Sequence, residues 1–480
     1  MTIQAVFFDM GGTIETFRSD RELRLKATPA LIELLLSKGI NLDLETNALF
    51  TLVNSGLDRY HKWSISSLIE LSPAKVWKEY ILTGYPQFFP ILDEIGEELM
   101  FWIDTNYFER TLRPEVPAVL EKLHNMGLVI GLISNVCSHG QVPENLKRYG
   151  IIQYFDTIVT SSDYGRRKPD PSIFHRAAFL AKVPTSRCSY VGDRISRDIL
   201  GARRAGFCLS IQINHDFEHG EIDEGAQPDA VIDTMNELIP IIQKENLIFP
   251  ILPSDNNPIK AFLFDAGDIL YFRPRRGIIF NEFLKKHCVI DTNNNSRKNE
   301  IKQLAYNGEI SRVDYFRELI KSYGIEDPIT IEEGTRILHE ADDDITFFDG
   351  VYNTLKELKQ KGYLLGIITD SAVPVYLKLS WFDKGGFADV WDSYISSQEI
   401  GTQKPDPRIY LASLEQIGLE PHQAVFVGHD PEELAGARNI GMSTIAFNSD
   451  LGAVADHTIE RFQDLLTVQF CAATSPDVLP

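Results

Sequence analysis

Two short segments of this sequence end an apolar run in an aspartate. The first is FFDMGGTIE, which contains Asp9, and the second is FLFDAGDIL, which contains Asp265. In both halves of the chain, further apolar runs end near a serine or threonine, near a Lys-Pro-Asp-Pro segment, and in Val-Gly-Asp or Val-Gly-His. Carboxylates, hydroxyls and ammonium groups act in proteins as nucleophiles, as ligands of hard cations and as partners of anions. Their chemistry depends on whether the fold brings them together.

Apolar runs and helical patterns alternate along the first half of the chain. The runs that indicate strands are residues 5–9, 128–134, 188–193 and 208–213. The helical patterns are residues 115–127 and 171–182. Asp170 is expected to cap the second helix, with Pro171 at its first position. The alternation predicts an α/β fold, in which helices cover both faces of a doubly wound, Rossmann-like parallel sheet.

In a sheet of this kind, ligands bind in the crevice beyond the carboxyl ends of the strands. Four polar residues of the first half fall at or after the predicted strand ends: Asp9, Ser134, Lys168 and Asp193. The fold is therefore expected to gather two carboxylates, a hydroxyl and an ammonium group in one crevice.

The chain also repeats itself over its whole length. Three pairs of segments match: 120–135 with 355–370, 168–177 with 404–413, and 190–206 with 426–441. A repeat of this length indicates two tandem domains rather than a solenoid. The expected division is a first domain at 1–245, a linker at 246–258, a second domain at 259–465 and a tail at 466–480.

The ordered set of segments in the first half resembles the haloacid dehalogenase (HAD) superfamily. The set is Asp9-Met-Gly-Gly-Thr13, then Ser134, then Lys168 in Lys-Pro-Asp-Pro, then Gly192-Asp193 with Asp198 in a GDxxxxD pattern. Each segment alone is a weak signal, but the ordered set recurs in large part in the second half. The resemblance implies a helical cap inserted after the first strand of each domain, at about residues 16–110 and 272–347.

The resemblance also implies roles for these residues. Asp9 would attack phosphorus and form an aspartyl-phosphate. Ser134 would donate a hydrogen bond to a phosphoryl oxygen, and Lys168 would offset the negative charge of both groups.

A metal site is implied in the same way. Asp193, Asp9 and the backbone carbonyl of Gly11 would hold Mg²⁺, a hard cation that prefers oxygen ligands. Asp198 would lie behind this site and orient Lys168. The expected cofactor is therefore Mg²⁺.

One residue departs from the pattern of the family's phosphatases. The resemblance implies a second aspartate two residues after the nucleophile, since phosphatases of the family usually carry one there to protonate the leaving group. That position is Gly11 here, and Gly267 in the second half. Three interpretations stay open: a leaving group that is already a stable anion, an acid supplied by the aromatic-rich cap, which also holds His61, or binding without turnover. Because the GDxxxxD pattern is kept, phosphoryl chemistry is favoured over dehalogenation.

The second half matches the family less well. Asp268 and Ile269 replace the usual glycine and threonine after Asp265, and His429 replaces the aspartate that corresponds to Asp193. Imidazole is a poorer ligand for Mg²⁺ than carboxylate. This half is therefore interpreted as a degenerate copy, whose residual site would comprise Asp265, Thr369, Lys404 and Asp430, with Glu433 matching Asp198.

Composition narrows the class of partner. The chain has 480 residues and a formal net charge of −21 at pH 7, which argues against nucleic acid or an anionic membrane surface. The sequence shows no secretory signal, no apolar stretch near the ~18 residues of a membrane span, and no cysteine framework. A cytoplasmic protein is therefore expected. One role expected for the second half is to pack against the first.

The predicted function is that of a Mg²⁺-dependent hydrolase or phosphotransferase that acts on a small phosphorylated metabolite through Asp9. The alternative is a non-catalytic protein that binds a phosphorylated ligand or acts as a scaffold. The kept aspartates and lysine favour catalysis, whereas the glycines at both acid positions favour binding.

Overall fold

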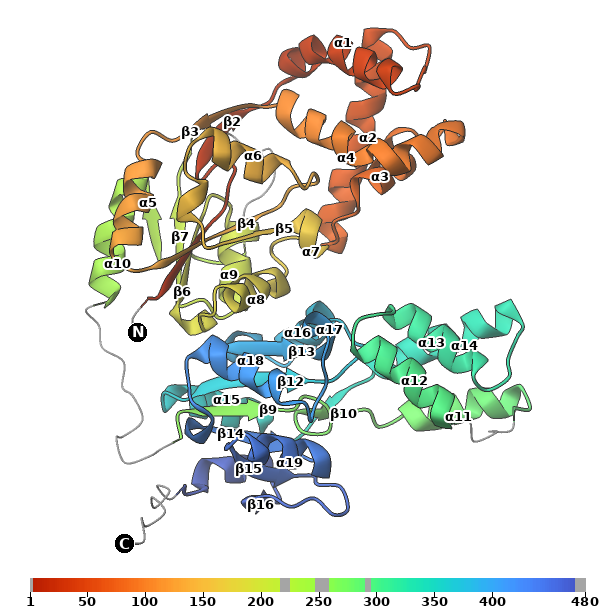
Figure 1. The fold of residues 1–480 in the computed structure, drawn as a ribbon, viewed down its shortest axis with the longest axis vertical. Helices are drawn as coiled ribbons and strands as arrows, with labels where there is room; N and C mark the ends of the chain where they lie inside the picture. The colour runs from red at the N-terminus through yellow and green to blue at the C-terminus, as the bar shows by residue number, and fades with distance from the viewer. Residues whose placement is uncertain (1–2, 216–224, 247–258, 290–294, 471–480) are drawn as a thin grey trace, which may run out of the picture. The chain divides into compact units, whose positions relative to one another are not determined.

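The fold is seen in a computed structural model, and the structure describes residues 3–215, 225–246, 259–289 and 295–470. The chain divides into two compact units, residues 1–249 and 250–480, which Figure 1 draws in red to green and green to blue. Most of the expected linker and the end of the expected tail, residues 247–258 and 471–480, lie outside the described residues. Within the described part of the chain, no helix has the length and apolar character needed to cross a membrane.

The first unit is built on a six-stranded parallel sheet with the order β5-β4-β1-β6-β7-β8. The strands are β1 (Ala5–Phe8), β4 (Val129–Ser134), β5 (Thr157–Thr160), β6 (Cys188–Gly192), β7 (Leu209–Ile213) and β8 (Ala230–Ile232). The α/β fold predicted from the alternating patterns is confirmed. At the centre, Phe8 of β1 pairs with Leu132 of β4 and Val191 of β6, so the ends of these three strands lie side by side.

Helices cover both faces of this sheet, because the side chains of β1 alternate between two cores. Val6 and Phe8 face one core and Phe7 faces the other, and all three are almost fully buried, which for side chains of this size stabilises the fold by roughly 1.5–3 kcal/mol each. The first core is closed by α5 (Val116–Asn125), α6 (Gln141–Arg148) and α10 (Leu238–Asn246). The second is closed by α8 (Pro171–Leu180) and α9 (Leu200–Arg204).

The start of α8 follows the sequence prediction. Asp170 Oδ1 accepts a hydrogen bond from the Ser172 backbone N–H at 2.9 Å, and Pro171 is the first residue of the helix. A proline lacks the N–H that a first-turn residue leaves unpaired, so it costs nothing there. This cap fixes the direction of the loop that carries Lys168.

A helical insertion leaves the first unit after β1. Two short antiparallel strands, β2 (Glu15–Arg18) and β3 (Glu109–Leu112), lead to it and back. Its helices are α1 (Arg21–Ser37), α2 (Thr46–Ser67), α3 (Pro73–Val76) and α4 (Phe89–Asn106). The insertion has a core of its own, in which Trp77, Leu99 and Tyr107 are buried, and its helices are the red and orange ones grouped beside the sheet of this unit in Figure 1.

The second unit repeats this plan, with a six-stranded sheet of order β13-β12-β9-β14-β15-β16. Its strands are β9 (Ala261–Phe264), β12 (Leu364–Thr369), β13 (Ser393–Ser396), β14 (Ala424–Gly428), β15 (Ser443–Phe447) and β16 (His457–Ile459). The helices beside the sheet are α15 (Val351–Gln360), α16 (Val375–Lys384), α18 (Pro407–Ile417) and α19 (Pro431–Asn439).

This unit also has a helical insertion, which β10 (Tyr271–Phe272) and β11 (Thr346–Phe347) connect to the sheet. The inserted helices are α11 (Arg276–Lys286), α12 (Asn295–Tyr306), α13 (Arg312–Lys321) and α14 (Pro328–Asp343). At the other end of the unit, Leu466, Val468 and Phe470 pack against the core of the sheet, although the sequence suggested a tail from residue 466.

Candidate active site

Lys168 lies at the centre of the polar crevice in the first unit. Its Nζ donates to Asp9 Oδ1 at 2.7 Å and to Asp198 Oδ1 at 2.6 Å, and the lysine side chain is fully buried. Asp9 follows β1, Lys168 precedes α8, and Asp198 follows β6, so three separate segments meet here. The buried ammonium group and its two carboxylates stabilise one another. Removing one of them would leave an uncompensated buried charge and destabilise the fold.

Asp198 is held in a fixed orientation. Besides Lys168, its Oδ1 accepts from the Tyr190 hydroxyl at 3.2 Å, and its Oδ2 accepts from the Arg194 backbone N–H at 3.0 Å. A side chain on Gly192 would collide with it, since a Cβ there would lie 2.4 Å from Asp198 Cβ. These contacts place Asp198 behind Lys168, where it sets the position of the ammonium group.

Tyr190 is a member of this cluster that the sequence did not single out. Its hydroxyl accepts from Lys168 Nζ at 2.8 Å, and its one proton is shared between Asp198 Oδ1 and the Ile133 carbonyl, both at 3.2 Å. The only sequence signal is a bulky residue with a hydroxyl group within a buried strand. Asn135 was also missed; its Oδ1 accepts from the Lys168 backbone N–H at 2.9 Å and its Nδ2 donates to the Lys168 carbonyl at 3.1 Å. Asn135 thereby ties the lysine loop to the end of β4, where Ser134 lies.

Three carboxylates are close enough together to share a cation. Asp9, Asp193 and Asp198 each offer one oxygen, and these oxygens lie within 4.8 Å of one another. Burial raises the pKa of Asp9 to about 7; Lys168 acts to lower it, and Asp198 and Asp193 act to raise it further. Repulsion between buried carboxylates of this kind is what a bound divalent cation relieves, so the donor set fits Mg²⁺.

The loop after Asp9 closes directly on Asp193. Gly12 adopts φ +84°, and a Cβ on it would lie 2.5 Å from Asp193 Oδ2, so only glycine fits. Asp193 has a second neighbour, because His215 Nε2 lies 3.0 Å from Asp193 Oδ2. Neither contact was predicted; His215 follows β7 in no recognisable motif. Gly11 belongs to the same loop, which the Gly12 N–H closes by donating to the Glu15 carbonyl at 2.7 Å.

The position of the missing acid is lined by an aromatic ring and a guanidinium. A Cβ on Gly11 would lie 3.3 Å from the Phe17 ring and 4.0 Å from Arg110 Nη1. Arg110 Nη1 donates to Glu15 Oε1 at 2.5 Å, and the Glu15 side chain is fully buried. Tyr149 also donates to Glu15, at 2.7 Å. Among the described residues, the atoms nearest the acid position are thus those of an aromatic ring and of a guanidinium that is paired with Glu15.

The helical insertion contacts the sheet domain through carboxylates. Glu70 accepts from Ser161 Oγ at 2.5 Å and also pairs with Arg167, while Asp104 Oδ2 accepts from the Ser138 backbone N–H at 3.1 Å. Burial raises the pKa of the Asp104 carboxyl to about 6. His61, which the sequence raised as a residue of this insertion, is exposed on α2.

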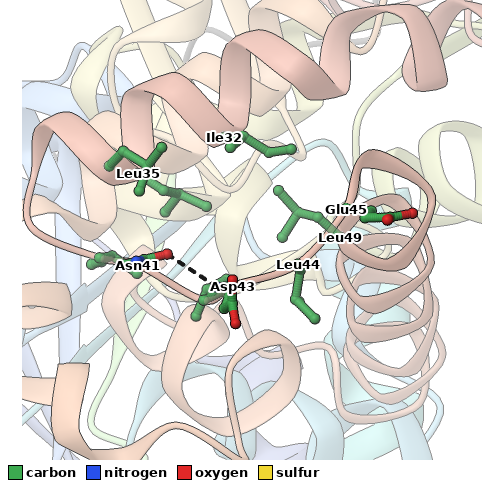
Figure 2. A pocket seen from close by; sticks show the side chains of 10 residues that line it. Ile32, Leu35, Asn41, Asp43, Leu44, Glu45 and Leu49 are labelled. Carbon is green, nitrogen blue, oxygen red and sulfur yellow. Dashed lines mark hydrogen bonds between the residues drawn. The ribbon is translucent and has the colours of Figure 1, made fainter.

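Figure 2 shows a pocket of about 260 Å³ inside the insertion, between α1 and the start of α2. Leu35, Leu44 and Leu49 line it, and the Asp43 backbone N–H donates to Asn41 Oδ1 at 3.1 Å at its edge. None of the residues of the polar crevice lines this pocket. It therefore belongs to the packing of the insertion and not to the candidate active site.

The second unit keeps the lysine arrangement. Lys404 Nζ donates to Asp265 Oδ1 and to Glu433 Oε2, both at 2.7 Å. Although burial acts to lower it, Asp265 and Glu433 hold the pKa of Lys404 well above its ordinary value. Thr369 ends β12, as Ser134 ends β4 in the first unit. The lysine, its two carboxylates and the strand-end hydroxyl are thus common to both units.

The other side of Asp265 differs. His429 stands where the first unit has Asp193; its Nε2 lies 3.6 Å from Asp265 Oδ2 and its Nδ1 lies 3.1 Å from Asp450 Oδ2. Asp430 Oδ1 accepts from the Glu432 and Glu433 backbone N–H groups at 2.7 and 3.1 Å. Asp430 therefore caps α19, and its place in the residual site stays a prediction. Among the described residues, the first unit holds the only group of three potential metal ligands.

Comparison with known proteins gives matches in both units. A family model described as haloacid dehalogenase-like hydrolase matches residues 3–206, and a second with the same description matches residues 283–447. The chain is 30% identical over 257 residues to a glyceraldehyde 3-phosphate phosphatase of Methanopyrus kandleri, covering 50% of this chain and 98% of that protein. It is 32% identical over 149 residues to a phosphoglycolate phosphatase of Vibrio parahaemolyticus, covering 31% of this chain and 64% of that protein. A crystal structure of a HAD phosphatase from Thermococcus onnurineus matches at 25% identity and a TM-score of 0.35, covering 50% of this chain and 98% of that one.

Proposed function

The chain belongs to the haloacid dehalogenase-like hydrolases, and we propose that its first unit is a Mg²⁺-dependent phosphatase for a small phosphorylated metabolite. The relatives named above are phosphatases of phosphoglycolate and glyceraldehyde 3-phosphate, and a further relative in Bacillus velezensis is a pyrophosphatase. All three substrates are small and carry a phosphoryl group. The substrate proposed for this chain is likewise a small phosphorylated compound. Its leaving group is a separate question, because phosphoglycolate and glyceraldehyde 3-phosphate both lose an alkoxide.

The observation that carries the proposal is the buried contact of Lys168 with Asp9. In the proposed reaction, a carboxylate oxygen of Asp9 attacks phosphorus while the bond from phosphorus to the leaving oxygen breaks, and the electron pair departs with that oxygen. Lys168 and Ser134 stabilise the charge on the phosphoryl oxygens. Water then attacks phosphorus while the bond from phosphorus to the Asp9 oxygen breaks, which restores the Asp9 carboxylate; the proton of the water leaves with the released phosphate.

Asp9, Asp193 and the Gly11 carbonyl would hold the Mg²⁺ ion. When bound, the ion supplies positive charge that allows the Asp9 carboxylate and an anionic phosphoryl group to approach each other. Asp198 keeps Lys168 in position through its 2.6 Å contact, and the Gly12 loop holds Asp193 in place.

The leaving group is proposed to depart as a stable anion, such as a carboxylate or a phosphate. Gly11 cannot move a proton, and the space beside it is lined by Phe17 and Arg110. A guanidinium stays charged at every physiological pH, so Arg110 would stabilise an anion there and would not protonate an alkoxide. This feature favours acyl phosphates and pyrophosphates over sugar phosphates.

The test is phosphate release by the purified full chain, with Mg²⁺ and with EDTA, from a panel of candidate substrates. The panel comprises sugar phosphates, nucleotides, acyl phosphates, pyrophosphate and phosphonates, with Asp9→Asn as control. We expect release that requires both Mg²⁺ and Asp9 and is confined to substrates with stable leaving groups. Release from sugar phosphates would instead indicate an acid from the insertion, where Asp104 is the candidate to substitute. No release from any compound would favour the non-catalytic binding protein.

A further inference from the structure

The second unit contains a buried lysine that has no equivalent in the first. Lys378 lies on α16, is 2% exposed, and its Nζ donates to Thr369 Oγ1 at 2.6 Å. The corresponding helix of the first unit, α6, carries its basic residues Lys147 and Arg148 on the exposed side. In the second unit alone, an ammonium group therefore points at the hydroxyl that ends the strand next to Asp265.

Lys378 lacks the counter-ions that Lys404 has. Among the described residues, no carboxylate lies within ion-pair distance of its Nζ, whereas Lys404 contacts both Asp265 and Glu433. Burial lowers the pKa of Lys378 to about 7. A buried ammonium group that has a hydroxyl partner but no carboxylate within ion-pair distance destabilises the fold. An arriving anion would supply the missing partner.

Arg273 acts electrostatically on Lys378 and belongs to a cluster of guanidinium groups in the insertion. Arg273 and Arg276 share Asp342 Oδ1, at 3.1 and 2.9 Å, and Arg312 Nη2 lies 3.0 Å from Asp342 Oδ2. Asp343, the other carboxylate of this cluster, pairs with Arg312 at 2.7 Å. Three guanidinium groups therefore meet two carboxylates.

Carboxylates also face the crevice of the second unit. Asp265 and Glu433 pair with Lys404, and Asp370 Oδ2 accepts from the Lys404 backbone N–H at 3.0 Å. Space for a ligand remains beside Asp265, because a Cβ on Gly267 would meet no atom within 4 Å. The carboxylates nearest the nucleophile position are thus already engaged by Lys404.

We propose that the second unit binds the phosphate group of a small molecule without a divalent cation, with Lys378 and Lys404 supplying the positive charge that is proposed for Mg²⁺ in the first unit, and with the His429 imidazole available as a further hydrogen-bond donor. The Thr369 hydroxyl would complete the set of donors around the phosphate oxygens. Charge-assisted hydrogen bonds of this kind are among the strongest in proteins. This site is independent of the reaction proposed for Asp9, since it involves other residues and needs no metal.

The test is isothermal titration of the full chain with inorganic phosphate in excess EDTA. Lys378→Met removes the ammonium group, and Lys384→Met, at the exposed end of the same helix, is the matched control. We expect the parent and Lys384→Met to bind phosphate equally, and Lys378→Met to bind it on the order of 10- to 100-fold more weakly. Any first-unit binding would be common to all three proteins.

Thr369→Val serves as a second variant, because it removes a donor without removing a charge. We expect Thr369→Val to bind phosphate more weakly than the parent as well. If Lys378→Met does not fold, the phosphate affinity of Thr369→Val tests the proposal in its place. Absence of phosphate binding by the parent in EDTA would overturn the proposal. Equal affinity of Lys378→Met and Lys384→Met would also overturn it, and would leave Lys378 as a structural residue only.

Discussion

The two units hold their nucleophile-position aspartates by the same contact and differ in what lies on the opposite side. Lys168 and Lys404 each lie 2.6–2.7 Å from two carboxylates. Opposite the lysine, the first unit has Asp193 and the second has His429. The lysine and its two carboxylates therefore form the same arrangement in both units, although only the first unit has a group of three potential metal ligands among the described residues.

The exchange at this position involves a pair of residues in each unit. Asp193 contacts His215 at 3.0 Å in the first unit, and His429 contacts Asp450 at 3.1 Å in the second. Both units therefore pair an acid with an imidazole, but opposite members of the pair face the aspartate. The loop changes too: Gly12 closes on Asp193, whereas the second unit carries Asp268 at φ +57°.

The largest effect is expected when the first unit receives the histidine that the second unit has at the position of Asp193. Asp193→His removes a carboxylate from the proposed cation site and replaces it with a weaker ligand for Mg²⁺. We expect Mg²⁺-dependent phosphate release to fall by about 10⁴-fold, which corresponds to about 5 kcal/mol. Steady-state kinetics at saturating Mg²⁺ measure it. A variant that keeps a tenth of the parent's rate would remove Asp193 from the site.

Two of the buried lysines, Lys168 and Lys378, allow a comparison of stability. Lys168→Met leaves Asp9 and Asp198 buried without their partner, and should lower the free energy of unfolding by about 3–5 kcal/mol. Lys378→Met removes a charge that has no carboxylate partner, and should leave stability unchanged or raise it. Urea unfolding of both variants without phosphate checks this. Equal destabilisation would show that Lys378 has a counter-ion in solution.

The reverse exchange should create a cation site. His429→Asp places a carboxylate beside Asp265 in the second unit, in the arrangement that Asp193 and Asp9 have in the first. We expect titration with Mn²⁺, followed by electron paramagnetic resonance, to reveal one more bound equivalent than in the parent. An unchanged stoichiometry would mean that Asp268 or the α19 cap prevents the site from forming.

The smallest effects concern the acid position. An added side chain at Gly11 meets the Phe17 ring at 3.3 Å, whereas one at Gly267 meets nothing within 4 Å. Gly11→Asp is therefore expected to cost about 1 kcal/mol of unfolding free energy, and Gly267→Asp less than about 0.5 kcal/mol. Thermal unfolding of the two variants gives the difference. The opposite order would contradict the packing described for Phe17.

The sequence predicted the parts of the site that lie in short local patterns. Strand ends position Asp9, Ser134 and Asp193, and the Asp-Pro cap of α8 fixes the loop of Lys168, so apolar runs and cap residues were sufficient. Asp430 is a second example of an aspartate that caps a helix beginning with proline. It precedes Pro431, as Asp170 precedes Pro171, and its carboxylate caps a helix, although the sequence predicted a place for it in the residual site.

The rest depends on packing between distant segments. Lys378 is one of several lysines on the helices of its unit, and only its position against Thr369 distinguishes it. Arg110 lies on the strand that returns from the insertion, a hundred residues from Gly11 in the sequence yet beside it in space. Local periodicity carries no information about such contacts, which tertiary packing decides.

The central claim is that the first unit performs the reaction and the second does not. The most direct test is phosphate release, in Mg²⁺, by the parent, Asp9→Asn and Asp265→Asn, measured side by side on the best substrate of the panel. We expect Asp9→Asn to lose all measurable release and Asp265→Asn to keep the parent's rate within about twofold. Loss of release in Asp265→Asn would mean that the second unit takes part in the reaction, and release that survives in Asp9→Asn would mean that Asp9 is not the nucleophile.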